Sequence, residues 1–429
     1  LFRSNVGDNA FTLTLNGSSF VPNSIAKFNG TSLTTTFVNS SQITAQVSAS
    51  NLINPASVNI TVFSPAPAGG TSSAQVLTIV GGSISGTKFE DTDGNGVKDV
   101  GESGLSNWKI KINGASTDSQ LTDGSGNYSF TNLPSGSYIV SEVSQNGWSQ
   151  TLPSAPGTYS LTVAGASISY SEKNFGNFYL GSISGLVFND LNGDSIKQGG
   201  ESGVSVWKIK ITGPRVDSVL SDGSGNYSFG NLPVGTYTVS EVLQAGWIET
   251  YPASQTYSLV ITSGSTYLNK NFGNFQQPGI NGIVFDDVNG NSVKDPGESG
   301  LQNWKIKITG TATDSVLSNS DGTYAFSNLA AGTYTISEVL QNGWIVTLPA
   351  NPYTYTVSLQ SSQNATGKDF GNFLPGSISG KIFNDANGNG VKDVGEAGLQ
   401  NWKARITGTK TDSALSDVNG NYTFSSLTV

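Results

Sequence analysis

The fold is decided by Trp108-Lys109-Ile110-Lys111-Ile112, a stretch in which apolar and charged side chains alternate. Successive side chains of a β-strand point to opposite faces, so this alternation predicts a strand with one buried face. A second stretch, Tyr138-Ile139-Val140-Ser141-Glu142-Val143, predicts another such strand. Turn-forming sequences such as Asp123-Gly124-Ser125-Gly126 separate the stretches, and none has a helical period. We therefore expect an all-β fold.

This pattern occurs four times along the chain, at a period of about 98 residues. The equivalent glycines Gly86, Gly185, Gly282 and Gly380 lie 99, 97 and 98 residues apart. Each copy has an acidic loop and then a tryptophan strand, and seven or so strands fit into one copy. That size is typical of an antiparallel β-sandwich of the immunoglobulin-like or prealbumin-like kind. The tryptophans are Trp108, Trp207, Trp304 and Trp402.

Five domains are expected from this periodicity. They are a leading β domain (1–80), repeat 1 (81–179), repeat 2 (180–277), repeat 3 (278–375) and an incomplete repeat 4 (376–429). Junctions such as Phe178-Tyr179-Leu180-Gly181 are very short, so the tandem domains are expected to form an elongated, semi-rigid rod. Repeat 4 lacks its last strands and should expose core and strand edges. Either the chain is cut there or a partner supplies the strands.

The composition excludes several classes of function. The 429 residues include no Cys, His or Met, which removes thiolate zinc sites, Ser-His catalysis and most transition-metal chemistry. We therefore expect no enzyme. A net charge of −9 disfavours nucleic acid and anionic membrane surfaces, and no apolar run approaches the ~18 residues of a membrane span. The chain opens without a Met, so the lack of a signal peptide does not argue against secretion.

An acidic loop occupies residues 91–102 of repeat 1. Oxygen-bearing side chains stand at alternating positions, with glycine at the sixth position and glutamate at the twelfth. This spacing matches the twelve-residue calcium loop of EF-hands, in which alternate side chains converge on one ion and the last glutamate closes the site. The expected ligands are Asp91, Asp93, Asn95, the backbone carbonyl of Val97, Asp99 and Glu102.

The loops of the other repeats are variants of the first. Repeat 3 has Ser292 at the sixth position, and repeat 2 has Ser195 there and Gln198 in place of the ninth-position acid. We expect about one Ca²⁺ per repeat, bound most tightly in repeat 1 and least in repeat 2. The expected ligands are Asp190, Asn192, Asp194, Ile196 and Glu201 in repeat 2; Asp287, Asn289, Asn291, Val293, Asp295 and Glu298 in repeat 3; and Asp385, Asn387, Asn389, Val391, Asp393 and Glu396 in repeat 4.

No helices flank these loops, so we expect a structural ion that staples strands together rather than a sensor that opens helices. Two other sets of residues admit alternative interpretations. Further acidic residues serve either as turn formers or as additional cation ligands: Asp118, Asp123, Asp217, Asp222, Asp314, Asp412 and Asp417. The tryptophans that follow a turn glycine either join the core or stack on carbohydrate: Trp148, Trp247 and Trp344.

Each copy resembles a known family through its acidic loop, the stretch from Gly126 to Glu142, and the closing Asn174-Phe175-Gly176-Asn177-Phe178. The family is the SdrD B-like calcium-binding repeats of bacterial serine-aspartate repeat adhesins, within the wider Cna B-type group. The resemblance covers residues 82–429 and implies a β-sandwich stalk that calcium makes rigid, holding a binding region away from the cell. The leading domain resembles an IPT/TIG immunoglobulin-like domain through Asn16-Gly17-Ser18-Ser19-Phe20, Phe28-Asn29-Gly30, Thr36-Phe37-Val38 and Pro67-Ala68-Gly69-Gly70.

The wider group includes domains with an internal Lys–Asn bond assisted by a glutamate. Glu142, Glu241 and Glu338 occupy the matching pattern. Lysine is the obstacle, because Lys109 alternates with core Trp108 and should face solvent. The other candidate, Lys88, has no lysine at the equivalent positions Val187, Val284 and Ile382. The sequence therefore disfavours such a bond.

Taken together, these features favour a calcium-stabilised structural stalk or filament subunit of a secreted, cell-surface protein. Two alternatives stay open at this stage: a glycan- or protein-binding adhesin module, and a non-catalytic part of a larger secreted enzyme. The expected partners are a second copy of the chain, completing repeat 4, or a glycan or protein of a host or cell surface.

Overall fold

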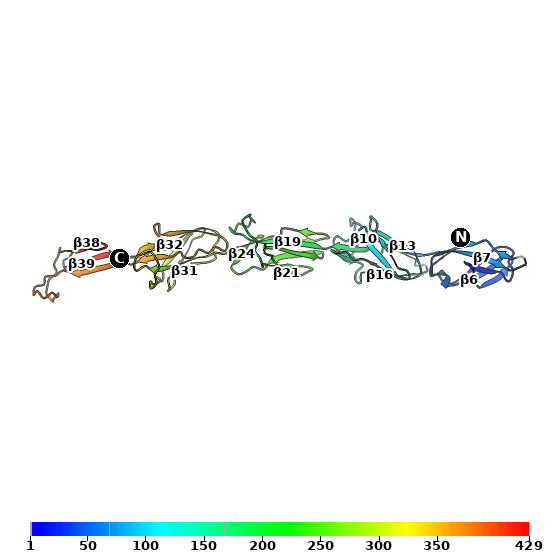
Figure 1. Cartoon of the computed structure of the whole chain (residues 1–429), viewed down its shortest axis with the longest axis horizontal. Helices are drawn as coiled ribbons and strands as arrows, with labels where there is room; N and C mark the ends of the chain where they lie inside the picture. The colour runs from blue at the N-terminus through cyan, green and yellow to red at the C-terminus, as the bar shows by residue number, and fades with distance from the viewer. Residues whose placement is uncertain (1, 68, 166–167, 429) are drawn as a thin grey trace.

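The computed structural model describes residues 2–67, 69–165 and 168–428, so Ala68 of the leading-domain motif lies outside the described residues. The domains follow one another in a single line, with the leading domain at one end and repeat 4 at the other (Figure 1). This arrangement confirms the expected elongated rod. No helix in the described part of the chain is long and apolar enough to cross a membrane.

The leading domain contains two sheets. One has the strand order β1-β9-β7-β3-β4, with β8 paired to β7, and the other has the order β2-β6-β5. Two of its strands, β4 and β8, have only two residues each. The bounds are β1 (Phe2–Asn5), β2 (Phe11–Asn16), β3 (Ile25–Phe28), β4 (Thr31–Ser32), β5 (Thr35–Asn39), β6 (Gln42–Val47), a 3-10 helix (Ala49–Leu52), β7 (Ala56–Ser64), β8 (Gly70–Thr71) and β9 (Gln75–Val80).

Repeat 1 is a sandwich of two sheets. The first has the order β13-β10-β18-β15, with β17 paired to β10, and the second has the order β12-β11-β14-β16. The alternating stretches that predicted the fold are β11 and β14. The bounds are β10 (Gly82–Glu90), β11 (Lys109–Gly114), β12 (Asp118–Leu121), β13 (Asn127–Leu133), β14 (Gly136–Glu142), β15 (Trp148–Leu152), β16 (Thr158–Val163), β17 (Ser169–Tyr170) and β18 (Phe175–Tyr179).

Repeat 2 reproduces this topology, and repeat 3 does so with an isolated bridge between Ile280 and Ala365 in place of the short strand equivalent to β17. Repeat 2 consists of β19 (Gly181–Asn189), β20 (Lys208–Thr212), β21 (Asp217–Leu220), β22 (Asn226–Leu232), β23 (Gly235–Glu241), β24 (Trp247–Tyr251), β25 (Thr256–Ile261), β26 (Thr266–Tyr267) and β27 (Phe272–Gln276). Repeat 3 consists of β28 (Ile280–Asp286), β29 (Lys305–Gly310), β30 (Asp314–Leu317), β31 (Thr323–Phe326), β32 (Gly332–Val339), β33 (Ile345–Leu348), β34 (Thr354–Leu359) and β35 (Phe370–Phe373).

The sheets are not wholly antiparallel, because the first and last strands of each complete domain pair in parallel. In repeat 1, Lys88 of β10 lies opposite Phe175 of β18, and the leading domain pairs β1 with β9 in the same way. Parallel pairing sends the chain into a domain at one end and out at the other. The domains therefore join end to end, and the local alternation of the sequence could not reveal this pairing.

The core of each complete repeat lies between its two sheets. In repeat 1 the inward residues of β11 and β14, Ile110, Ile112, Tyr138 and Val140, are all buried, and Trp108 is 2% exposed. Lys109 is exposed, as its alternation with Trp108 predicted. The tryptophan strand therefore belongs to the core, as the sequence indicated.

Repeat 4 has two separate two-stranded sheets, β36–β39 and β37–β38. Its core positions face solvent: Trp402 is 56% exposed and Ile378 51%, whereas the equivalent Trp108 and Ile84 are buried. The expected exposure of core is confirmed. The bounds are β36 (Gly376–Lys381), β37 (Lys403–Ile406), β38 (Asp412–Leu415) and β39 (Asn421–Leu427).

Candidate metal centres

The acidic loop of repeat 1 leaves the end of β10 and folds around Asp91, which is completely buried. Asp91 Oδ1 accepts a hydrogen bond from Asn95 N at 3.1 Å, and its Oδ2 accepts one from Gly96 N at 2.8 Å. Glu102 reaches back from the other end of the loop, where its two oxygens accept bonds from Thr92 N at 2.6 Å and Asp99 N at 3.1 Å. The first and twelfth positions thus hold both ends of the loop together.

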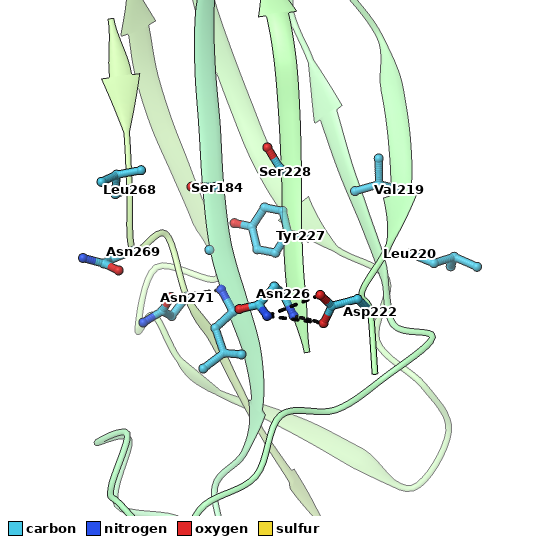
Figure 2. Close-up of a pocket in the computed structure, with 12 residues that line it drawn as sticks. Ser184, Val219, Leu220, Asp222, Asn226, Tyr227, Ser228, Leu268, Asn269 and Asn271 are labelled. Atoms are coloured by element: carbon cyan, nitrogen blue, oxygen red, sulfur yellow. Dashed lines mark hydrogen bonds between the residues drawn. The ribbon is translucent and has the colours of Figure 1, made fainter. Parts of the chain in front are cut away.

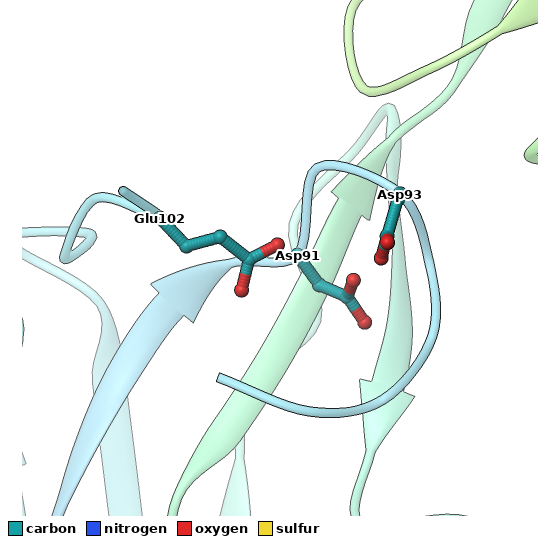
Figure 3. Close-up of side chains that lie close together, drawn as sticks. All are labelled: Asp91, Asp93 and Glu102. Carbon is teal, nitrogen blue, oxygen red and sulfur yellow. The ribbon is translucent and has the colours of Figure 1, made fainter. Parts of the chain in front are cut away.

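Three of the expected ligands meet at one point. Asp91, Asp93 and Glu102 each offer an oxygen within 4.8 Å of the other two (Figure 3). Asn95 Nδ2 lies against the same group, donating to Asp93 Oδ2 at 3.1 Å and to Asp99 Oδ2 at 2.7 Å. A half-turn of this amide exchanges its nitrogen for its oxygen, and the loop then presents convergent oxygens, the ligands that Ca²⁺ prefers.

The other loops repeat this wrapping with fewer carboxylates. Asp190 and Asp287 are completely buried at the first position, while Asp385 is half-buried. Glu201 Oε1 accepts from Leu191 N at 2.8 Å, and Glu396 Oε1 from Ala386 N at 2.7 Å. Within the described residues, the three-carboxylate group of repeat 1 is the one cluster of its kind. The order of calcium affinity among the four loops stays a prediction.

The side chains in the middle of each acidic loop contact one another. The ninth-position carboxylates of repeats 3 and 4 accept amide hydrogens from the loop asparagines, at 2.7 to 2.8 Å. In repeat 2, Asp194 Oδ2 accepts from Asn192 Nδ2 at 2.9 Å and also from Gln198, which replaces the ninth-position acid. The seventh-position side chains are exposed, which suits residues that would offer only a backbone carbonyl: Val97, Ile196, Val293 and Val391.

The sixth position has the same backbone conformation in every loop. Gly96 and Gly390 have φ of +76° and +75°, and Ser195 and Ser292 have φ of +68° and +66°. This left-handed region is open to glycine but strains a residue with a Cβ. Replacement of glycine by serine therefore leaves the path of the loop unchanged and makes it less favourable.

The acidic loops of repeats 1 and 2 also touch the following repeat. The second-position carbonyl of the repeat 1 loop, Thr92 O, accepts a hydrogen bond from Ser263 N of repeat 2 at 2.9 Å. Ser263 Oγ in turn accepts from Tyr179 N, at the end of repeat 1, also at 2.9 Å. Gly94 lies so close to Val234 of repeat 2 that an added Cβ would come within 2.4 Å of it.

The joint between repeats 2 and 3 has the same construction. Leu191 O, again at the second position, accepts from Ser361 N at 2.9 Å, and Ser361 Oγ accepts from Gln276 N at 2.8 Å. Sequence reasoning missed Ser263 and Ser361, because a serine in a polar loop carries no signal of a contact to another domain.

The other candidate residues have local roles in the structure. Asp123 and Asp222 each accept backbone hydrogen bonds from residues two and four positions later, as turn-forming side chains do. Asp217 and Asp412 form ion pairs with nearby basic side chains. Trp148, Trp247 and Trp344 are half-buried, and each packs edge-on against the core tryptophan of its repeat. These contacts favour the turn and core interpretations.

An open groove of about 690 Å³ lies beside β19 and β22 in repeat 2 (Figure 2). Its polar groups serve the domain itself: Asp222 accepts from Asn226, and the Tyr227 hydroxyl donates to Lys270 O. A smaller groove of about 410 Å³, lined by Asn281, Gly282 and Tyr324, occupies the same place in repeat 3. The grooves are thus a property of the repeat architecture.

Comparison with known families identifies the repeats. The model of the SdrD B-like domain matches residues 82–174, 181–262 and 279–369, more than half of the chain. The chain belongs to the SdrD B-like domain family. The matched ranges do not include the leading domain, whose IPT/TIG resemblance stays a prediction, or residues 376–429.

Curated relatives of these SdrD B-like repeats are much longer proteins. Serine-aspartate repeat-containing protein F of Staphylococcus epidermidis is 26% identical over 276 residues, covering 58% of this chain and 17% of the relative. Serine-aspartate repeat-containing protein D of Staphylococcus aureus is 25% identical over 380 residues, covering 79% of this chain and 28% of the relative. The chain therefore spans less than a third of either relative.

Two solved structures from Bacillus species are among those that match this chain. The Bacillus anthracis TIE protein has a TM-score of 0.31 and 14% identity, with 87% of this chain and 73% of that chain covered. BcpA, the major pilin subunit of Bacillus cereus, has a TM-score of 0.29 and 10% identity, with 68% and 99% covered.

Proposed function

We propose that this chain is a segment of an extracellular stalk whose joints are stiffened by calcium. The observation that carries the proposal is the double role of the acidic loop. One loop gathers Asp91, Asp93 and Glu102, and its next residue, Thr92, makes the contact to repeat 2. Whatever orders this loop also orders the joint between the two domains.

Calcium suits the loop chemistry. All side chains that converge on the site offer oxygen, and neighbouring carboxylates at this density repel one another unless a cation lies between them. Ca²⁺ would be held by Asp91, Asp93, Asn95, the Val97 carbonyl, Asp99 and Glu102, and by the equivalent residues of the other loops. Bound there, it supplies positive charge and fixes the loop path, without chemical reaction.

A cell-surface location and a spacer role follow from the same features. Parallel pairing of first and last strands extends the chain by one domain length per repeat, which is the property that a spacer needs. Extracellular calcium modules work at millimolar or submillimolar affinity, so loops with three or four carboxylates suffice outside the cell. Catalysis has no part in the proposal, and partners are proposed to be another copy of the chain or a glycan or protein at a cell surface.

Small-angle X-ray scattering of the whole chain tests the proposal. We expect the maximum dimension to be that of a rigid rod in calcium, and the distance distribution to broaden in EGTA as the joints loosen. A variant with Ser263→Pro keeps the acidic loop but removes the backbone donor to Thr92 O, so it should bend at that joint even in calcium. If neither EGTA nor this variant changes the scattering curve, calcium does not stiffen the joints.

A further inference from the structure

Every acidic loop has a lysine at its eighth position, which is not a ligand position of the twelve-residue calcium loop. These residues are Lys98, Lys197, Lys294 and Lys392. The sixth, ninth and tenth positions vary between the loops, whereas the lysine recurs together with the aspartate of the first position and the glutamate of the twelfth. A positive charge near a cation site repels the ion, so a lysine in all four loops requires an explanation.

The lysine side chain folds back onto the strand that enters the loop. Lys98 Nζ lies 5.4 Å from the centre of the Phe89 ring, near the end of β10. In the other loops the corresponding distances are 5.9, 5.9 and 6.0 Å, to the rings of Phe188, Phe285 and Phe383. An ammonium within about 6 Å of an aromatic ring is attracted by the negative face of that ring. All four lysines therefore share one placement.

The same phenylalanine lies where the chain returns after the loop. Phe89 forms a β-bridge with Gly104, and Glu90 N donates to Ser103 O at 2.9 Å. The two ends of the loop therefore meet beside the ring that the lysine covers. Phe89 is completely buried, so its ring is a fixed support for the lysine.

The lysine ammonium also donates a hydrogen bond to the loop backbone, and the acceptor differs between repeats. In repeat 1, Lys98 Nζ donates to the carbonyl of the twelfth residue, Glu102 O, at 2.6 Å, and repeat 3 has the equivalent bond. In repeats 2 and 4 the acceptor is the carbonyl of the next residue, Gln198 O or Asp393 O, at 2.8 Å. The bonds of repeats 1 and 3 thus span the last turn of the loop, and those of repeats 2 and 4 do not.

We propose that Lys98, and its equivalent in repeat 3, is a positioning residue that keeps the glutamate end of the loop closed before calcium binds. This inference rests on the calcium site proposed above. Glu102 closes the loop by accepting from Thr92 N and Asp99 N, although the carboxylates gathered there repel one another. The bond from Lys98 fixes the backbone of Glu102, and the Phe89 ring fixes Lys98. The lysine thereby offsets part of the repulsion in a loop that holds no ion.

A loop that is already closed binds calcium more tightly. When the closed form is only partly populated, the apparent affinity falls by the fraction that is closed, so a residue that raises this fraction raises the affinity. Repulsion of the ion by the lysine is limited, because Lys98 is exposed to water and its charge is screened. In the described part of the chain, the three ion pairs do not include a loop lysine, so the loop carboxylates stay available to the ion.

Hydrogen exchange of the whole chain, in EGTA and along a calcium titration, tests the proposal. Lys98→Met keeps a long unbranched side chain against the ring but removes the charge and the hydrogen-bond donor. In EGTA we expect the Thr92 and Asp99 amides to exchange about threefold to tenfold faster than in the wild type, and the calcium dissociation constant of repeat 1 to rise by a similar factor. Lys98→Arg keeps the charge, the donors and the ring contact, so it should restore most of both values.

Two matched controls separate the position of the lysine from its charge. Lys111→Met removes a positive charge from the exposed face of β11 in the same repeat, and it should change neither value. Lys197→Met removes the lysine of repeat 2, whose hydrogen bond reaches only the next residue. The Leu191 and Gln198 amides, which donate to Glu201 as Thr92 and Asp99 do to Glu102, should then exchange faster by about twofold or less.

The outcomes distinguish this inference from the calcium proposal. If the wild-type loop binds no calcium but Lys98→Met still exchanges faster in EGTA, the role of the lysine is supported and the calcium proposal is refuted. Unchanged exchange of Lys98→Met in EGTA would overturn the inference, because the lysine then does not hold the loop closed. Tighter calcium binding by Lys98→Met would also overturn it, because the lysine then acts on the ion only through repulsion.

Discussion

Repeats 1 and 2 share one fold but differ in the residues of their acidic loops and in one buried position of their cores. Repeat 1 gathers three carboxylates in its acidic loop and buries an amine beside Glu142, whereas repeat 2 has serine and glutamine in the loop and Val187 in place of the amine. Glu241 of repeat 2 is consequently a buried carboxyl group with an asparagine donor but no cation, and burial raises its pKa to about 7.

This difference shows that the same buried glutamate can play opposite parts in neighbouring domains. In repeat 1 the carboxylate compensates the buried positive charge of Lys88, whose Nζ lies 3.3 Å from Glu142 Oε2. In repeat 2 the carboxyl group has no cation beside it, so burial raises its pKa and favours the protonated form. The repeat that adjoins the leading domain is thus the reinforced one, and repeat 2 is the weaker neighbour.

The largest expected effect comes from removing the buried glutamate in each repeat. Glu142→Gln leaves the Lys88 ammonium buried without a counter-charge, so repeat 1 should lose about 3–5 kcal/mol of stability. Glu241→Gln removes only an uncompensated acid, so repeat 2 should change by about 1 kcal/mol or less, or become more stable. Hydrogen exchange of β14 and β23 in the whole chain measures the stability of repeats 1 and 2 separately. Equal losses of stability in the two repeats would contradict the predicted difference between them.

Calcium should stabilise the two repeats by different amounts, and this difference should be somewhat smaller than the effect of the glutamate substitutions. An ion at about 100 times its dissociation constant adds about 2.7 kcal/mol to the stability of its domain. We expect Asp91→Ala to abolish this gain in repeat 1, and Asp190→Ala to remove less at the same calcium concentration, because the repeat 2 loop has fewer carboxylates and is predicted to bind more weakly. Hydrogen exchange of each loop with calcium and with EGTA measures the gains, and a larger gain in repeat 2 would reverse the predicted order.

The pH should act on repeat 2 through Glu241. Because its pKa in the folded state is raised to about 7, its contribution to stability is complete below the unfolded value of about 4.3 and is lost as the pH rises through 7. Between pH 5 and pH 8 we expect repeat 2 to lose about 2 kcal/mol relative to Glu241→Gln, allowing for the partial exposure of the group.

Comparing the wild-type chain with the variant in EGTA cancels the titration of the loop carboxylates. Glu338→Gln provides a second test in repeat 3, where burial likewise raises the pKa of Glu338 to about 7. A stability difference that stays constant from pH 5 to pH 8 in both repeats would show that these glutamates are charged throughout.

The sequence predicted those features that depend on local spacing. Alternation along Trp108–Ile112 gave the strand and its buried face, and the twelve-residue spacing gave the convergence of Asp91, Asp93 and Glu102. Pairing between distant segments left no such signal. Lys88 and Phe89 are adjacent and both buried, which breaks the alternation expected of a half-buried strand, because the acidic loop covers the second face of β10 at Phe89, with Lys98 Nζ 5.4 Å from the centre of its ring. The burial of Lys88, and hence its contact with Glu142, could not be predicted from alternation.

The smallest expected effect concerns the sixth loop position. Ser195 has a left-handed φ of +68°, which costs a residue with a Cβ roughly 1–2 kcal/mol, while glycine loses about 0.5–1 kcal/mol through the greater freedom of its unfolded chain. Ser195→Gly should therefore stabilise repeat 2 by about 0.5–1 kcal/mol and bring its calcium affinity closer to that of repeat 1. Ser292→Gly is the matched control, because Ser292 Oγ donates to Thr347 O at 2.9 Å and its loss offsets the relief of strain. Calcium titrations of the two variants should show a gain in repeat 2 and almost none in repeat 3, and a loss of affinity in Ser195→Gly would mean that backbone strain does not weaken this loop.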